Sequence, residues 1–138
     1  MIKRVFVDSD VILDVALARQ PFLDGSRMLL SLLENNIALG FISANCVANI
    51  YYFLRKSGGD SKARLFISNL LKYLTVSPVD HSNIVSSLKS EFSDFEDAIQ
   101  YHSALEAQCE CIVTRNIEDY KKSNIEVYLP IEFVNLYE

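Results

Sequence analysis

Strand-like and helix-like segments alternate along this chain, which predicts a three-layer α/β/α domain with a central, mostly parallel sheet of four to five strands. Half of the 138 residues are apolar, and they include eight Phe and seven Tyr. That composition supports one hydrophobic core and leaves no room for a second, so we expect residues 1–138 to form a single domain. Acidic residues also follow several predicted strands, where open parallel sheets usually place their functional groups.

Short apolar runs, some of them rich in β-branched residues, predict the strands. The first run ends at Asp8, and Pro78 ends the third. The predicted strands cover residues 4–8, 38–43, 75–77, 111–114 and 126–128.

Apolar residues at helical spacing and residues that favour helix ends predict the helices. Ser9 is expected to cap the first helix, and Pro21 and Pro130 fit helix starts. Ser93 and Glu96 fit a capping box at the start of the longest helix. The segment 57–60, which contains two glycines, is the clearest predicted loop. The predicted helices cover residues 11–17, 26–36, 45–56, 61–73, 80–89 and 93–108, with a short helix from residue 130.

The charge balance restricts how this protein could bind nucleic acid. Eighteen acidic residues outnumber thirteen basic ones, for a net charge of −5, whereas binding through the overall field needs the opposite sign. A nucleic-acid role would therefore rest on metal ions or on a local basic patch. Arg55, Lys56, Lys62 and Arg64 are the best candidates for such a patch, although a plain solvated surface explains them better.

The sequence also bears on location. The apolar stretch at the N-terminus is too short for a signal peptide, and no segment approaches the length of a membrane span. Three cysteines, an odd number in apolar surroundings, favour reduced thiols over a disulfide framework. We therefore expect a cytoplasmic protein with no membrane partner.

Asp8 and the acids near residue 97 are the strongest candidates for a site. Asp8 follows a buried strand directly, and its ordinary interpretation is a helix-capping acid. Asp94, Glu96 and Asp97 lie within four residues, where like charges repel unless a cation intervenes. Some of this charge could simply complement the helix dipole. Oxygen ligands favour Mg²⁺ or Mn²⁺ over zinc.

Other common kinds of site find no support in the sequence. His81 and His102 lack zinc-like spacing to other ligands. Gly58 and Gly59 are an isolated pair of glycines and not a Gly-rich phosphate-binding loop. No Ser or Cys occupies a nucleophile elbow.

Four motifs in order resemble the PIN domain family. Residues 5–14 read VFVDSDVILD, where the family has an Asp at the end of the first strand and an Asn or Asp two residues later. Residues 94–98 (DFEDA) resemble the third motif, and residues 112–120 (IVTRNIEDY) resemble the fourth. The ending PIEFV at residues 130–134 is also common in the family. Each motif is weakly specific alone, but together they cover nearly the whole chain.

The resemblance implies a PIN-like fold and an Mg²⁺- or Mn²⁺-dependent ribonuclease that leaves a 5′-phosphate and a 3′-hydroxyl. Carried over by position, Asp8 and Asp97 would be the metal ligands. Asn116 takes the place of the fourth acid, with Asp119 close enough to assist, and Asp94 is an extra acid of the catalytic set. Ser9, Thr114 and Asn49 would surround the ligands, and Arg115 would contact an RNA phosphate, although a surface ion pair explains Arg115 equally well.

One motif departs from the family. The helix after the second strand usually carries a Glu at the position that Asn49 occupies. Asn cannot act as an anionic bridge, and neither can Asn116, so metal affinity should fall and a two-ion site is doubtful. Residues 46–54 are apolar almost all round, which predicts a well-buried helix in which Asn49 makes a structural hydrogen bond or lies beside the site.

Three functions remain open at this point. Many bacterial single-domain PIN proteins are VapC-type toxins, which implies an RNA substrate, an antitoxin partner and a homodimer. A catalytically weakened PIN-like protein that binds RNA or protein is the alternative that Asn49 and Asn116 support. A receiver-type phosphoacceptor ranks last, because Arg115 and Asn116 follow strand four where that fold needs a Lys. The aromatic run 51–53 is explained by core packing more simply than by a partner surface.

Overall fold

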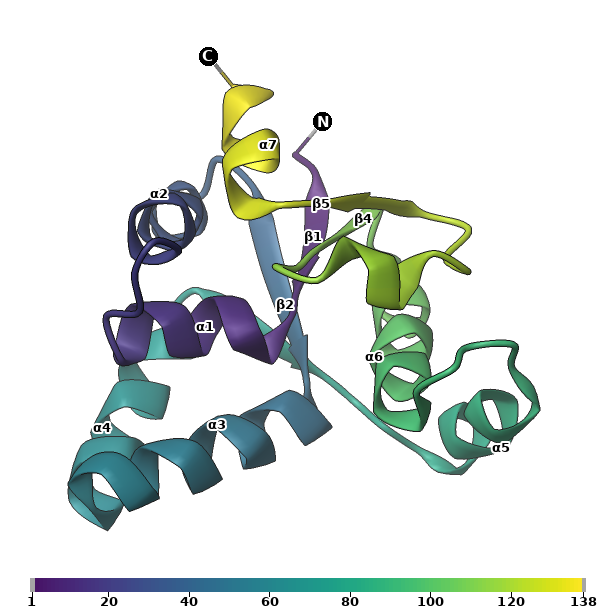
Figure 1. Cartoon of the computed structure of the whole chain (residues 1–138), viewed down its shortest axis with the longest axis horizontal. Helices are drawn as coiled ribbons and strands as arrows, with labels where there is room; N and C mark the ends of the chain where they lie inside the picture. Colours follow the sequence, from purple (N-terminus) through teal and green to yellow (C-terminus); the bar gives the residue numbers. More distant parts are fainter. Residues whose placement is uncertain (1, 138) are drawn as a thin grey trace.

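The computed structural model describes residues 2–137, which form five strands, seven α-helices and one 3₁₀ helix (Figure 1). The strands are β1 (Arg4–Val7), β2 (Leu39–Ser43), β3 (Leu74–Ser77), β4 (Cys111–Val113) and β5 (Glu126–Tyr128). The α-helices are α1 (Ser9–Ala16), α2 (Leu23–Glu34), α3 (Ala44–Gly58), α4 (Asp60–Leu70), α5 (His81–Lys89), α6 (Phe95–Glu106) and α7 (Pro130–Asn135). The 3₁₀ helix is η1 (Ile117–Tyr120).

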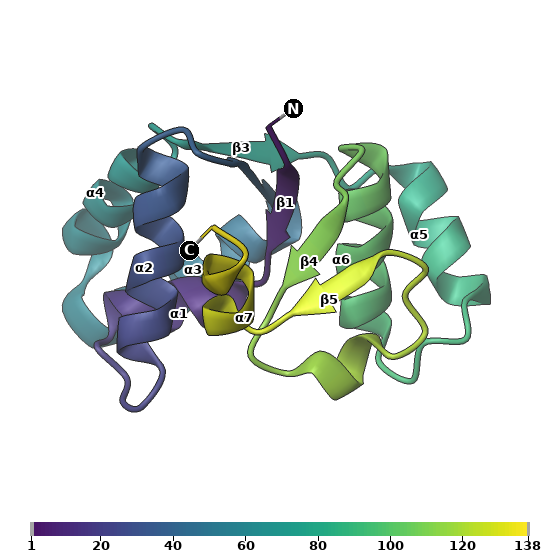
Figure 2. The ribbon, with the colours of Figure 1, turned by 90° about the horizontal axis from the view of Figure 1, so that it is seen from above.

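All five strands are parallel and lie in the order β3-β2-β1-β4-β5. Helices α1, α2 and α4 lie on one side of the sheet, with α3 against α1 and α4 and with α7 against α2; α6 covers the other side, and α5 packs against α6 (Figures 1 and 2). This arrangement confirms the predicted α/β/α fold with its parallel sheet. Residues from segments far apart in the sequence meet at the carboxyl edge of this sheet, where the strands end.

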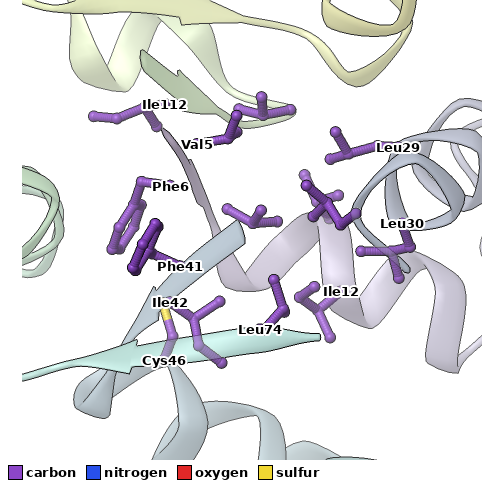
Figure 3. Close-up of a cluster of buried hydrophobic side chains, with 14 of the residues drawn as sticks. Val5, Phe6, Ile12, Leu29, Leu30, Phe41, Ile42, Cys46, Leu74 and Ile112 are labelled. Carbon is purple, nitrogen blue, oxygen red and sulfur yellow. The ribbon is translucent and has the colours of Figure 1, made fainter. Parts of the chain in front are cut away.

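The core explains why β1 lies at the centre. Val5, Phe6 and Val7 have no exposed surface, because helices cover both faces of the sheet. Phe6 lies beside Phe41 on one side, whereas Leu29 and other helical side chains pack on the opposite side (Figure 3). Successive residues of a strand point to opposite faces, so a continuous apolar run is what a doubly covered strand requires.

Two local predictions about helix boundaries are wrong. The predicted loop at 57–60 consists of one residue, Gly59, since α3 continues to Gly58 and α4 begins at Asp60. Gly59 has a φ of 92°, a conformation that other residues rarely adopt, and this lets the two helices meet with one residue between them. The first helix is capped by Asp8 rather than Ser9, because the Asp8 carboxylate accepts a hydrogen bond from the Ser9 backbone N–H.

The prediction that α3 is buried all round is also wrong. Cys46, Ile50 and Leu54 form its buried face, whereas Tyr52 and Phe53 are 56% and 50% exposed. The aromatic run therefore contributes little to the core beyond the half-buried Tyr51. Helix α3 packs against α1, α4 and the ends of β2 and β3, and its remaining side stays open to solvent whatever its composition.

All three cysteines are buried and free. Within residues 2–137, no helix is both long enough and apolar enough to span a membrane.

Candidate functional site

The sheet register places the ends of β1 and β4 side by side. Val7 pairs with Val113, so Asp8 and Thr114 leave the sheet together. The backbone N–H of Asp8 still donates to the Val113 carbonyl oxygen at 3.0 Å, which fixes the direction in which its side chain leaves. Residues 106 positions apart thereby form one wall of the site.

Asp8 is held by three donors. The Ser9 N–H donates to its Oδ1 at 2.7 Å, and the hydroxyls of Thr114 and Tyr120 both donate to its Oδ2 at 3.0 Å. Burial nevertheless raises the pKa of Asp8, and the charge of Asp119 raises it further. The hydrogen bonds fix the carboxylate in place but do not compensate for its lost hydration.

Asp10 lies next to Asp8 and was absent from the predicted site residues. Asn116 donates an amide hydrogen to its Oδ2 at 2.8 Å, and the Arg115 backbone N–H approaches its Oδ1 at 3.5 Å. Burial raises the pKa of Asp10 to about 7, and the charge of Asp8 adds to that effect. The Asp-x-Asp pattern of the first motif was the signal that could have identified it.

Asp97 faces the same space from the start of α6. Its pKa is raised to about 7, first by burial and then by the charges of Asp94, Asp8, Asp119 and Glu96. Such coupling to Asp8 and Asp119 means that acids from three separate segments share one region. Asp8 and Asp97 therefore do not lie on opposite sides of the molecule.

Asp94 caps α6, a role that was predicted for Ser93. Its carboxylate accepts from the Asp97 backbone N–H at 3.0 Å. The predicted capping box of Ser93 and Glu96 is therefore wrong, because the helix begins two residues later, at Phe95. Asp94 thus fixes the first turn of α6 and adds negative charge beside Asp97.

Tyr120 is a site residue that sequence reasoning missed. It is 1% exposed, and its hydroxyl donates to Asp8. Its pKa is raised well above the usual value by burial and by the charges of Asp8 and Asp97. Nothing in the sequence distinguishes this tyrosine from an ordinary core residue, because η1 was not predicted.

The remaining predicted residues lie around these acids or farther away. Asp119 is exposed on η1, and Ser9 is half-buried at the start of α1. Asn49 is half-buried on α3, one turn beyond Cys46. Burial raises the pKa of the Cys46 thiol to about 12, and the charge of Asp8 adds to the shift, so α3 begins near the site.

Arg115 is paired inside the protein rather than extended over the acids. Its Nε lies 3.2 Å from the Asp14 carboxylate, and its guanidinium carbon lies 4.1 Å from the centre of the Phe22 ring. The predicted phosphate contact thus depends on the part of the guanidinium that stays accessible, since 27% of the side chain is exposed.

The donor set fits one hard divalent cation better than two. Burial first, and the charges of neighbouring acids second, raise the pKa values of Asp8, Asp10 and Asp97, and a bound cation would favour their charged forms. Within the described part of the chain, however, no group of three or more His, Cys, Asp or Glu could hold a metal ion by itself. Mg²⁺ is commonly held by one or two carboxylates and several waters, which is what Asp8 and Asp97 could provide.

Comparisons with known proteins point to one family. A family model described as PIN domain matches residues 4–118. Ribonuclease VapC1 of Aquifex aeolicus (strain VF5) is 26% identical over 136 residues, which cover 95% of this chain and 93% of that protein.

Solved structures share the fold. One is VapBC2 from Rickettsia felis bound to a DNA fragment from their promoter, which matches with a TM-score of 0.67 at 16% identity over 91% of this chain and 96% of that one. Another is a toxin–antitoxin complex from Klebsiella pneumoniae, with a TM-score of 0.67 at 19% identity over 91% and 97% of the two chains.

Proposed function

Because this chain belongs to the PIN domain family, we propose that it is a divalent-metal-dependent endoribonuclease and the toxin of a toxin–antitoxin pair. The observation that carries the proposal is that distant segments meet at the carboxyl edge of the sheet, where Thr114 and Tyr120 donate to Asp8 and the charge of Asp8 reaches Asp97. The relative named a ribonuclease supports the activity, and the similarity to a toxin–antitoxin complex supports the biological role.

The hydrogen bonds around Asp8 and Asp97 indicate the role that each residue would have. Asp8 is fixed by Thr114 and Tyr120, so it can present a carboxylate in one orientation. Asp97 lies on the first turn of α6, where the Asp94 cap fixes the backbone. Asp8 and Asp97 would hold Mg²⁺ or Mn²⁺. The ion would polarise the scissile phosphate and lower the pKa of an attacking water.

Asn116 and Asp119 would act beside Asp8, on the segment that follows β4. The Asn116 amide donates to Asp10 and so orients that carboxylate, while the exposed Asp119 can hold a water by accepting its hydrogen. Hydrolysis would leave a 5′-phosphate and a 3′-hydroxyl. An antitoxin would act by covering this edge of the sheet, and homodimer formation remains a prediction.

The decisive experiment is cleavage of structured RNA with Mn²⁺ by the wild type and by Asp97→Asn. We expect the variant to lose activity on the order of a hundredfold or more, because a metal ligand contributes several kcal/mol to the transition state. Glu34→Gln, which neutralises an exposed acid at the end of α2, is the control and should cleave normally. Equal cleavage by wild type and Asp97→Asn would remove the catalytic assignment.

A second function is a weakened PIN-like protein that acts by binding RNA or protein. Asn116 favours it, because an amide stands where the family resemblance expects an acid. Calorimetry with Mn²⁺ separates the two functions. Heat of binding that disappears in Asp97→Asn supports the nuclease, whereas no binding at millimolar metal supports the alternative.

A further inference from the structure

A pocket of about 540 Å³ lies beside the candidate site, between the start of α2, the start of α7 and Arg115. Helices α2 and α7 lie next to each other there, on the same side of the sheet as α1 (Figure 2). Most of the lining is apolar and comes from Pro21, Phe22, Leu129, Pro130 and Ile131.

The polar part of the lining is incompletely paired. Asp14 has no exposed surface and Ser26 has 1%, yet neither the Asp14 oxygens nor the Ser26 hydroxyl makes a hydrogen bond within the described residues. Buried polar groups normally find hydrogen-bond partners, so the Ser26 hydroxyl is an exception, whereas the Asp14 carboxylate is held by ion pairs alone. Arg115 and Arg19 lie 3.2 and 3.8 Å from Asp14, which leaves the three side chains with a net positive charge.

Arg115 connects the pocket to the acids. Its side chain lines the pocket, while its backbone N–H lies 3.5 Å from Asp10 Oδ1. The next residue, Asn116, donates to the same carboxylate. A strand of RNA that placed a phosphate at the acids would therefore bring a neighbouring nucleotide to the mouth of the pocket.

We propose that this pocket binds a nucleobase of single-stranded RNA next to the scissile phosphate, an inference that rests on the proposed function. Aromatic rings and arginine planes are the usual stacking partners of unpaired bases, and here Phe22 and Arg115 stack on each other at the pocket. The Ser26 hydroxyl, which has no hydrogen-bond partner among the described residues, can meet the polar edge of the base. The Arg115 guanidinium, which lines the pocket, can contact the phosphate that accompanies it.

The test compares binding of a fluorescein-labelled single-stranded RNA with binding of an abasic ribose-phosphate oligomer of equal length, by fluorescence anisotropy. All proteins carry Asp97→Asn so that the RNA stays intact. Phe22→Ala should weaken RNA binding about five- to 150-fold, the range that corresponds to loss of one stacked base. Binding of the abasic oligomer should change less than about twofold, because no base is present to stack.

Gly25→Leu blocks the pocket without removing a wall. A Cβ at Gly25 would lie 3.7 Å from the Ile131 Cβ and 3.8 Å from the Pro130 Cβ, which are ordinary contacts, so the backbone of α2 can carry a side chain that points at the pocket walls. We expect the same selective loss of RNA affinity as for Phe22→Ala. Phe53→Ala truncates another exposed phenyl ring, 50% exposed on α3 against 37% for Phe22, and is the matched control, for which no loss is expected.

The outcomes separate this inference from the proposed function. Unchanged RNA affinity in both pocket variants, or equal losses for RNA and the abasic oligomer, would overturn the nucleobase assignment even if wild type cleaves RNA with Mn²⁺. The first result would favour a peptide side chain as the occupant. Absence of Mn²⁺-dependent cleavage, with base-selective binding intact, would overturn the nuclease and leave an RNA-binding pocket.

Discussion

Polar residues stand at the strand ends in both halves of the carboxyl edge of the sheet, but their partners differ between the two halves. At β2 and β3, Ser43 and Ser77 leave the sheet as a buried, paired set. The Ser77 hydroxyl donates to the Ser103 carbonyl oxygen at 2.8 Å, and the Ser43 hydroxyl donates to the Gln100 side chain, so both strand ends are fastened to α6. At β1 and β4, the corresponding residues are Asp8 and Thr114, and acids converge there instead.

The difference shows how one edge can be both a structural joint and a reactive site. Hydroxyl and amide groups at the β2–β3 half satisfy one another without net charge, so that half is stable when closed. Carboxylates at the β1–β4 half receive hydrogen bonds, but burial and the charges of neighbouring acids still raise the pKa values of Asp10 and Asp97 to about 7. We therefore expect an added cation to stabilise this half and not the other.

The largest expected contrast is in the pH dependence of stability without metal. Asp10 and Asp97 have pKa values raised from 3.8 to about 7, so between those values the folded state keeps protons that the unfolded state releases. Stability is therefore fully present below about pH 4 and is lost as pH rises to about 7. For the more buried Asp10 the loss should be on the order of 2 kcal/mol, whereas solvent screening makes the share of Asp97 smaller.

Urea unfolding of the wild type and of Asp10→Asn in EDTA measures this effect. The variant should lose less stability across the window, and Mn²⁺ at pH 7.5 should restore the wild type. Glu34→Gln should follow the wild-type curve. Parallel curves for wild type and Asp10→Asn would show that the acids do not strain the folded state.

A smaller effect is expected from a substitution at the β2–β3 half. Ser43→Ala removes the hydroxyl that accepts from the Cys46 backbone N–H at 2.9 Å and donates to Gln100, so buried groups lose their partners. The free energy of unfolding should fall by about 1–2 kcal/mol. Mn²⁺ binding by calorimetry should stay within about twofold of wild type, a negligible difference in free energy.

The control for this half is Ser57→Ala, at an exposed position near the end of α3, which should leave stability unchanged. A loss of metal binding in Ser43→Ala that equals the loss in Asp97→Asn would break the division into two halves.

The smallest effect is expected from a substitution at the β1–β4 half. Asn116→Asp replaces the amide that donates to Asp10 by another carboxylate. Metal-free stability should fall by about 1 kcal/mol, and Mn²⁺ affinity should rise by less than about tenfold, because one exposed charge is added to a site already rich in acids.

Asn124→Asp adds the same charge at an exposed position in the link to β5 and should alter neither quantity. Lower Mn²⁺ affinity in Asn116→Asp would show instead that the site needs the amide as a donor.

The sequence predicted the elements best where a pattern lies within one segment. The position of β5 agrees with the prediction, and Pro130 opens α7 as expected, because turn and start residues act locally. Boundaries that depend on competing caps were wrong. Both Ser93 and Asp94 are good caps, and the fold selects Asp94, which joins α6 to the site.

Of the site, the sequence by itself indicated that Asp8 follows the first strand and that acids open α6, because spacing carries that information, and these oxygen ligands predict Mg²⁺ or Mn²⁺. Tertiary structure decided how they are held. Tyr120 reaches Asp8 from 112 residues away, and Asn116 reaches Asp10 from 106 residues away. It also turned Arg115 towards Asp14 and Phe22, which no local pattern indicates. Such contacts depend on how distant elements pack, since a side chain's neighbours are set by the whole fold and not by its own segment.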